Sequence, residues 1–175
     1  DDVVYGFSHT HLSGTGVSDY GDILLMPVTG EPQLANGYPD TPEAGYASRF
    51  NKAEERASAG YYRTMLADYG IEVELTATPR TGLHRYVFPA GKPGHIIVDL
   101  EHRDDLIGAS LQVVDDNTIE GYRRSSAWAR DQLVHFRAVF SQPFSASAVV
   151  ANEAGELTKA ILSFGSDGGE VLVQV

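Results

Sequence analysis

Two histidines, His9 and His11, stand in a part of the sequence that is dense in side chains able to bind or react. A spacing of two on an extended strand predicts that both imidazoles point to the same side. With a carboxylate from Asp19 or Asp22 they would supply ligands that zinc accepts. Alternatively, one histidine packs and the other hydrogen-bonds a loop carbonyl, because paired histidines without cysteine or a clear third histidine often occur by chance.

Gly14 and Gly16, which lie between these histidines and aspartates, would allow backbone amides to approach a bound group closely. Such a turn can form a nest for an anion, although a tight loop with positive φ is the simpler interpretation. No lysine follows, which excludes a P-loop, and the third glycine of a dinucleotide fingerprint is missing. Asp19 and Asp22 can form an acid–base pair or cap the loop, whereas no nucleophile elbow surrounds the nearby serines.

The single tryptophan, Trp128, lies between two predicted strands beside serine and arginine residues. A lone tryptophan usually packs into the core because its ring is large and mostly apolar. On a loop, the same ring can act as a platform for the C–H-rich face of a sugar. The sequence supports both interpretations.

The composition excludes several classes of protein. The 175 residues include 24 acidic and 13 basic side chains, a formal net charge of −11, so we expect no nucleic-acid partner. Apolar residues make up 42%, too many for a disordered chain, and no apolar run reaches the roughly 20 residues of a spanning helix, so no membrane insertion is expected. The absence of cysteine excludes disulfides, cysteine-bound zinc and thiol nucleophiles.

From residue 61 onward, apolar and polar residues alternate with the period of two that is typical of half-buried strands. Turn residues join several of these segments into hairpins. Strands are expected over 61–66, 71–77, 85–88, 95–100, 109–114, 118–123, 133–140, 148–151, 159–164 and 171–175. Short strands in mostly hairpin order predict an all-β fold, an antiparallel β-sandwich.

Residues 1–45 are irregular and rich in glycine and proline, a composition that excludes long helices. One short strand is expected over 23–26, ended by Pro27, and one helical turn from Lys52 to Ala57. A structured segment of this length is usually functional or forms an interface.

The run from Gly6 to Gly16, followed by Asp19-Tyr-Gly-Asp22, resembles the N-terminal domain of glycoside hydrolase family 92, the exo-acting α-mannosidases. Further motifs are similar to the family in the same order and extend the resemblance over most of residues 5–145: Gly60-Tyr-Tyr62, Glu74-Leu-Thr-Ala-Thr78 with Arg80, His84-Arg-Tyr86 with Phe88-Pro89, Asp99-Leu100, and Trp128-Ala129 with Gln132 and Phe136. Each motif alone is weak, but together they are specific.

The resemblance implies a supersandwich-like β-sandwich packed on a larger helical barrel domain, and calcium-dependent, inverting hydrolysis of terminal α-1,2-linked mannose. The two carboxylates of such a reaction and the calcium ligands are expected in the helical domain. Residues 1–175 are therefore expected to be part of an N-terminal domain, inactive alone and binding no calcium itself. Expected partners are mannose-containing glycans and the helical domain, with N-glycan degradation by a bacterial protein that is periplasmic, cell-surface or secreted.

The residues expected to contact the sugar at the domain interface are His9, His11, Gly14, Thr15, Gly16, Asp19 and Trp128. Imidazoles donate or accept and carboxylates accept, and sugar hydroxyls need both kinds of partner. Docking predicts an apolar patch on residues 6–28, formed by Phe7, Leu12, Tyr20 and Met26. Two alternatives are a non-catalytic carbohydrate-binding or structural module, and a metal-dependent enzyme that uses His9 and His11.

Overall fold

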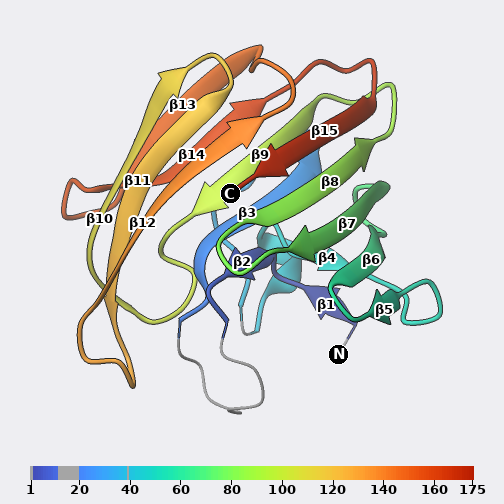
Figure 1. Cartoon of the computed structure of the whole chain (residues 1–175). Helices are drawn as coiled ribbons and strands as arrows, with labels where there is room; N and C mark the ends of the chain where they lie inside the picture. The colour runs from blue at the N-terminus through green and yellow to red at the C-terminus, as the bar shows by residue number, and fades with distance from the viewer. Residues whose placement is uncertain (1, 12–19, 39) are drawn as a thin grey trace.

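The strands, in which apolar and polar residues alternate, form two packed antiparallel sheets, as the sequence predicted (Figure 1). The computed structural model describes residues 2–11, 20–38 and 40–175. The larger sheet has eight strands in the order β10-β11-β12-β15-β8-β7-β6-β5, and the smaller sheet has five in the order β13-β14-β9-β3-β2. A two-stranded sheet, β1-β4, lies beside them. The all-β sandwich is thereby confirmed.

The strands of the larger sheet are β5 (Arg56–Ser58), β6 (Tyr61–Leu66), β7 (Ile71–Ala77), β8 (Gly82–Phe88), β10 (Asp105–Asp115), β11 (Thr118–Ser126), β12 (Gln132–Phe140) and β15 (Gly169–Gln174). Those of the smaller sheet are β2 (Phe7–His9), β3 (Asp22–Thr29), β9 (Gly94–Asp99), β13 (Ala146–Ala151) and β14 (Leu157–Ser163). The remaining elements are β1 (Val3–Val4), β4 (Ser48–Arg49) and a short 3₁₀ helix, η1 (Pro42–Ala44). Three of the pairs, β6–β7, β10–β11 and β13–β14, are hairpins at the predicted positions.

The predicted strand over 23–26 exists, but Pro27 does not end it. β3 continues, with Pro27 opposite Ile96 of β9. Proline has no N–H to donate, so a strand tolerates it best where one side has no paired neighbour. β2, on the other side of β3, pairs only at Asp22 and Leu25, and Pro27 lies beyond it.

The predicted helical turn from Lys52 to Ala57 is wrong. The chain makes a turn there, in which the Glu54 N–H donates to the Asn51 carbonyl at 2.9 Å, and then enters β5. One such bond does not nucleate a helix, because the first turn fixes several residues for a single hydrogen bond. Among the described residues, no helix is long and apolar enough to cross a membrane.

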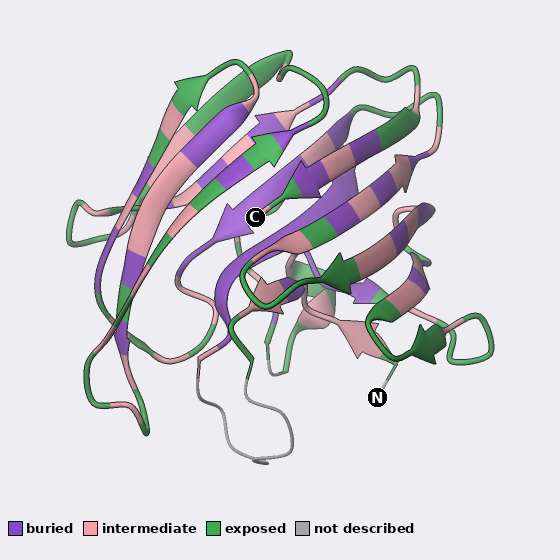
Figure 2. Ribbon diagram, in the orientation of Figure 1, coloured by how far each residue is buried: buried purple, intermediate pink, exposed green. Residues whose placement is uncertain are grey.

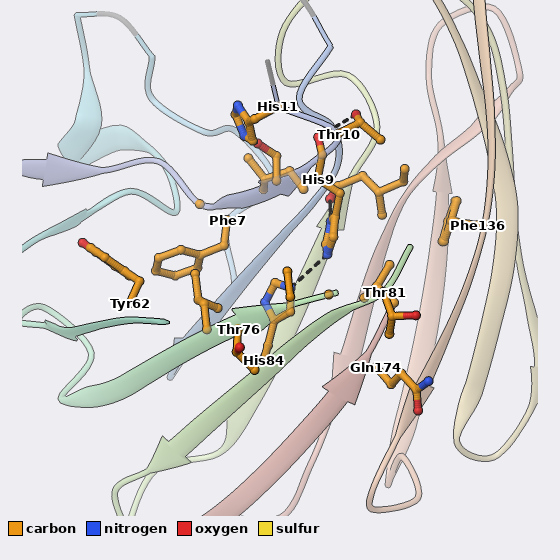
Figure 3. Close-up of a pocket in the computed structure, with 18 of the residues that line it drawn as sticks. Phe7, His9, Thr10, His11, Tyr62, Thr76, Thr81, His84, Phe136 and Gln174 are labelled. Carbon is orange, nitrogen blue, oxygen red and sulfur yellow. Dashed lines mark hydrogen bonds between the residues drawn. The ribbon is translucent and has the colours of Figure 1, made fainter. Parts of the chain in front are cut away.

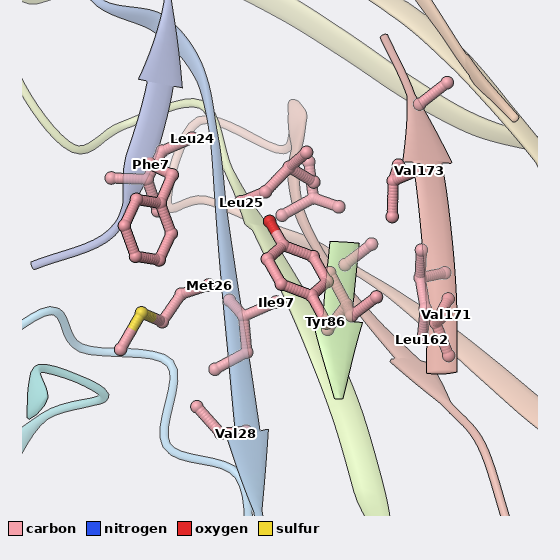
Figure 4. Packing of buried hydrophobic residues seen from close by; sticks show 14 of the residues in the cluster. Phe7, Leu24, Leu25, Met26, Val28, Tyr86, Ile97, Leu162, Val171 and Val173 are labelled. Atoms are coloured by element: carbon pink, nitrogen blue, oxygen red, sulfur yellow. The ribbon is translucent and has the colours of Figure 1, made fainter. Parts of the chain in front are cut away.

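The hydrophobic core lies between the two sheets (Figure 2). β3 is an internal strand of the smaller sheet, between β9 and β2, and it is buried along its whole length. Figure 4 shows Leu25, Tyr86, Ile97 and Val173 from both sheets packed together, and each of them is fully buried.

The predicted apolar patch on residues 6–28 is wrong for two of its members. Phe7 and Met26 are only 8% and 0% exposed, because both pack into the core from β2 and β3. Tyr20 is half-buried, and Leu12 lies outside the described residues. Phe7 and Met26 are therefore not available to a docking partner.

Candidate functional site

A cavity of about 1290 Å³ opens between β2, the β7–β8 turn and β12 (Figure 3). It forms because the larger sheet splits: β12 pairs with β15 only at Val139 and Phe140, so the rest of β12 has no partner on that side. Inward-facing apolar side chains that the second sheet would normally cover, such as Leu75 and Phe136, are only half-buried there. Concave sites of this size are where ligands usually bind.

Two histidines meet on the wall of this cavity, His9 from β2 and His84 from β8. Their Nε2 atoms are 2.9 Å apart. His9 Nδ1 faces the Ile23 carbonyl at 2.7 Å, and since a carbonyl only accepts, this nitrogen carries the hydrogen. With both rings neutral, His9 Nε2 accepts from His84, and His84 Nδ1 accepts from the Tyr86 hydroxyl at 2.6 Å.

Both rings are held neutral by their surroundings. Burial and the neighbouring His9 lower the pKa of His84 to about 3, and burial lowers the pKa of His9. Protonating His9 would point two N–H groups at each other, and protonating His84 would place a second N–H opposite the Tyr86 hydroxyl, which now donates to it. The pair is thus a part-buried structural contact joining the two sheets, with every ring nitrogen already engaged.

Gly82 makes room for this pair. A Cβ at Gly82 would lie 2.9 Å from both Cδ2 and Nε2 of His9. We expect Gly82→Ala to displace the His9 ring and leave the buried His84 N–H without its acceptor, at a cost of about 1–3 kcal/mol. Urea unfolding measures this cost. Gly165→Ala is the matched control, since a Cβ there meets nothing within 4 Å; an equal loss in both variants would contradict the prediction.

His9 and His11 do not face the same partner, contrary to the expectation from their spacing. Thr10 between them has a left-handed backbone, with φ of 61°, which breaks the alternation of the strand. His11 instead lies with Nε2 2.7 Å from the Ser8 hydroxyl. In the described ranges no group of three or more histidine, aspartate or glutamate side chains could hold a metal ion. The two rings therefore do not converge on one point, and Asp19, a further ligand of that alternative, lies outside the described residues.

Asp22, which the sequence offered with Asp19 as an acid–base pair, forms a buried ion pair with Arg123. Its Oδ1 accepts from Arg123 Nη1 at 2.7 Å, and neither side chain is exposed. Its Oδ2 accepts from the Thr10 hydroxyl at 2.6 Å and from the Gln132 amide. A carboxylate with these partners holds the chain in place and is not available as an acid or base.

Trp128 is 72% exposed and lies in the loop between β11 and β12, so it is not a core residue. Arg124 and Asp131 brace this loop, with Arg124 Nε 2.7 Å from Asp131 Oδ1. Trp128 does not line the cavity. The strand that follows its loop begins at Gln132, whose side-chain amide donates to Asp22. Four of the predicted sugar contacts, Gly14, Thr15, Gly16 and Asp19, lie outside the described residues.

Three residues at this end of the sandwich were not predicted as site residues: His84, Arg123 and Gln132. Alternation along β8 could have placed His84 inward, since Tyr86 and Phe88 share its face. Nothing local marks Arg123, whose partner Asp22 is 101 residues away.

Solved structures identify the class of protein that contains this sandwich: it is a domain of α-mannosidases. The family GH92 α-mannosidase BT3965 from Bacteroides thetaiotaomicron matches with a TM-score of 0.88 and 34% identity, over 99% of this chain and 26% of that chain. The GH92 glycosyl hydrolase ccman5 matches with a TM-score of 0.78 and 27% identity, over 99% and 26%. The inverting mannosidase BT2199 from the same Bacteroides species, at 21% identity and a TM-score of 0.80 over 99% and 24%, shows the fold alone.

The chain belongs to glycosyl hydrolase family 92, because the model of that family's N-terminal domain matches residues 1–175. This confirms the resemblance carried by the sequence motifs. The chain spans about a quarter of the length of the solved relatives, 26% of the first. Among curated proteins, no sequence matched.

Proposed function

We propose that the chain serves a calcium-dependent, inverting exo-α-mannosidase of the α-1,2 type, and that it completes the mannose pocket where the helical domain meets it. Membership in a family of α-mannosidases carries this proposal. BT3965 has also been solved in complex with mannoimidazole, and its sandwich matches this chain with a TM-score of 0.88. N-glycan degradation in the periplasm, at the cell surface or outside a bacterial cell fits this role.

The calcium and the catalytic carboxylates belong to the helical domain in this proposal. The described residues offer no fitting donor cluster for a metal ion, so no step is assigned to calcium on this chain. Inversion needs two carboxyls roughly 6.5–9.5 Å apart, one as acid and one as base. Asp22, which precedes the cavity residue Ile23 in the chain, is held in an ion pair with Arg123. The chain therefore binds and orients the sugar and does not exchange its protons.

His11 is the described residue best suited to contact a sugar. It is exposed at the cavity rim, beside Ser8. Partial desolvation of the ring and the nearby Arg103 lower the pKa of His11, so its imidazole is neutral at pH 7. Its Nε2 contacts the Ser8 hydroxyl, which leaves Nδ1 to donate to a sugar hydroxyl or to accept from one.

The test compares the polypeptide that carries both domains with residues 1–175 alone, using an α-1,2-linked mannobiose as substrate. We expect the two-domain enzyme to release mannose and the 175 residues to release none, with or without calcium, because losing the acid or base costs orders of magnitude. Release of mannose by the pure 175-residue chain would contradict the proposal.

Variants of the two-domain enzyme test the sugar contacts. We expect His11→Ala and Asp19→Ala to lower kcat/KM by roughly 10- to 100-fold through lost orientation, with the metal content unchanged. His95→Ala is the control, since His95 bonds Ser163 in the smaller sheet and does not line the cavity. Loss of a bound metal in His9→Ala or His11→Ala would favour the metal-enzyme alternative.

Exposure of Trp128 favours a second candidate, a carbohydrate-binding module without catalysis. In that case residues 1–175 alone would bind a mannose oligosaccharide in calorimetry, and Trp128→Ala would abolish the binding. The first proposal instead expects no measurable affinity without the helical domain.

A further inference from the structure

A fully buried arginine, Arg123, connects several chain segments at the end of the sandwich that carries the cavity. Arg123 of β11 is 0% exposed, as is its partner Asp22. Besides that ion pair, Arg123 Nε donates to the Leu100 carbonyl at 2.7 Å and Nη2 to the Asp104 carbonyl at 3.0 Å. One guanidinium therefore holds the start of β3 and the turn after β9, which carries two cavity residues, His102 and Arg103.

Asp22 passes this constraint on to the residue before His11. The Thr10 hydroxyl donates to Asp22 Oδ2 at 2.6 Å and accepts from the Asp22 backbone N–H at 3.2 Å. The Thr10 hydroxyl thus contacts both the side chain and the backbone of Asp22. Because His11 follows directly, its direction depends on the backbone of Thr10, and its ring lies close to Gly21.

The clamped backbone is strained. Thr10, Tyr20 and Ile23 have φ of 61°, 63° and 52°, and these are the non-glycine residues with positive φ within the described ranges. For a β-branched residue such as Thr10 or Ile23 this conformation is a genuine outlier. Strain of this kind persists only where the surroundings enforce it, and it gathers at functional sites.

We propose that Arg123 is a positioning residue for mannose binding, acting through Asp22 and Thr10 on the imidazole of His11; this rests on the proposed function. Stability alone does not account for the pair, because a buried ion pair can often be replaced by apolar residues of similar size without loss. An apolar residue at position 22 would keep the backbone N–H that the Thr10 hydroxyl accepts from, but it would remove the carboxylate to which that hydroxyl donates. In this proposal, the charges of Arg123 and Asp22 fix the backbone conformation at the cavity rim, where His11 lies.

The experiment uses the two-domain enzyme and four variants: Arg123→Met, Arg123→Lys, the double variant Arg123→Met with Asp22→Leu, and Arg49→Met as control. Arg49 forms an exposed ion pair with Asp68 and does not line the cavity. Thermal unfolding, kinetics with α-1,2-mannobiose and hydrogen–deuterium exchange are measured for each.

We expect Arg123→Met to lower the Tm strongly, because it leaves Asp22 charged and buried. The double variant should recover a large part of that Tm, yet keep a loss of about 100-fold in kcat/KM, mostly as a higher KM, as expected for a displaced binding group. Arg123→Lys should retain more activity than Arg123→Met. Amides of residues 9–11 and 20–23 should exchange faster in the double variant than in the control.

Recovery of kcat/KM together with Tm in the double variant would overturn the proposal and leave a purely structural ion pair. Unchanged exchange at residues 9–11 would overturn it as well, whatever the activity. If the unmodified enzyme releases no mannose, the proposed function fails, while the exchange measurement still decides whether Arg123 positions this segment.

Discussion

Acidification is expected to unfold this domain well before its carboxylates are protonated. Burial lowers the pKa of His84 to about 3 and that of His102 to about 4, whereas an unfolded chain protonates histidine near 6.5. Between these values the unfolded state binds protons that the folded state does not. The free energy of unfolding is therefore constant for these groups above pH 6.5 and falls as the pH decreases below it.

Each buried histidine contributes a slope of about 1.4 kcal/mol per pH unit in this window. Urea unfolding at pH 7.5, 6, 5 and 4 measures the combined slope. The variant His84→Gln isolates the contribution of His84 to this slope. Its amide can still contact His9 and Tyr86 but does not titrate. The slope should be smaller by about 1.4 kcal/mol per unit in this variant. An unaltered slope would show that His84 is protonated without cost in the folded state.

Phe140→Ala should cost about 3–5 kcal/mol, a large share of the stability of one domain. Phe140 is 1% exposed, and its ring centroid lies 5.1 Å from that of Phe144 and 6.2 Å from that of Phe164. These rings fill the space where β12, β14 and the β12–β13 connection meet. Truncation leaves a cavity that the sheets cannot close, because strand pairing fixes their spacing.

Thermal unfolding checks this prediction, with an expected fall in Tm of roughly 10 °C. Leu133→Ala on the same strand is the matched control. Leu133 points to the opposite face and is 53% exposed, so its loss should stay within about 0.5 kcal/mol. Equal effects in the two variants would mean that the face of β12 assigned to the core is wrong.

The strands and hairpins could be predicted because their signals are local. In β7, Ile71 and Val73 alternate with Glu72 and Glu74, and the apolar pair is fully buried. Such alternation requires only that one face of a strand be covered. The family motifs are equally local, and the family that they indicate is the one whose N-terminal domain matches the chain.

The polar end of the sandwich was only partly predictable. His11 was recognised as a candidate and lies at the cavity rim. The shared direction of His9 and His11 was wrong, because Thr10 leaves the extended conformation on which the spacing rule depends. From its residue type, Trp128 was more readily placed in the core than on a loop, and the packing of the chain instead leaves it exposed.

The class of fold, the hairpin order and the family could be read from the residues alone, since these follow from periodicity and local motifs. The partners of the key polar groups became clear only in the folded chain. His9 contacts His84, which lies 75 residues further along the sequence, and Asp22 pairs with Arg123, which lies 101 residues further along. No local pattern specifies such pairs, because they depend on how the two sheets stack and where the larger one splits. Burial between the sheets then keeps the rings neutral and makes the loss of one partner of the ion pair costly, and both effects arise from the low polarity of the packed interior.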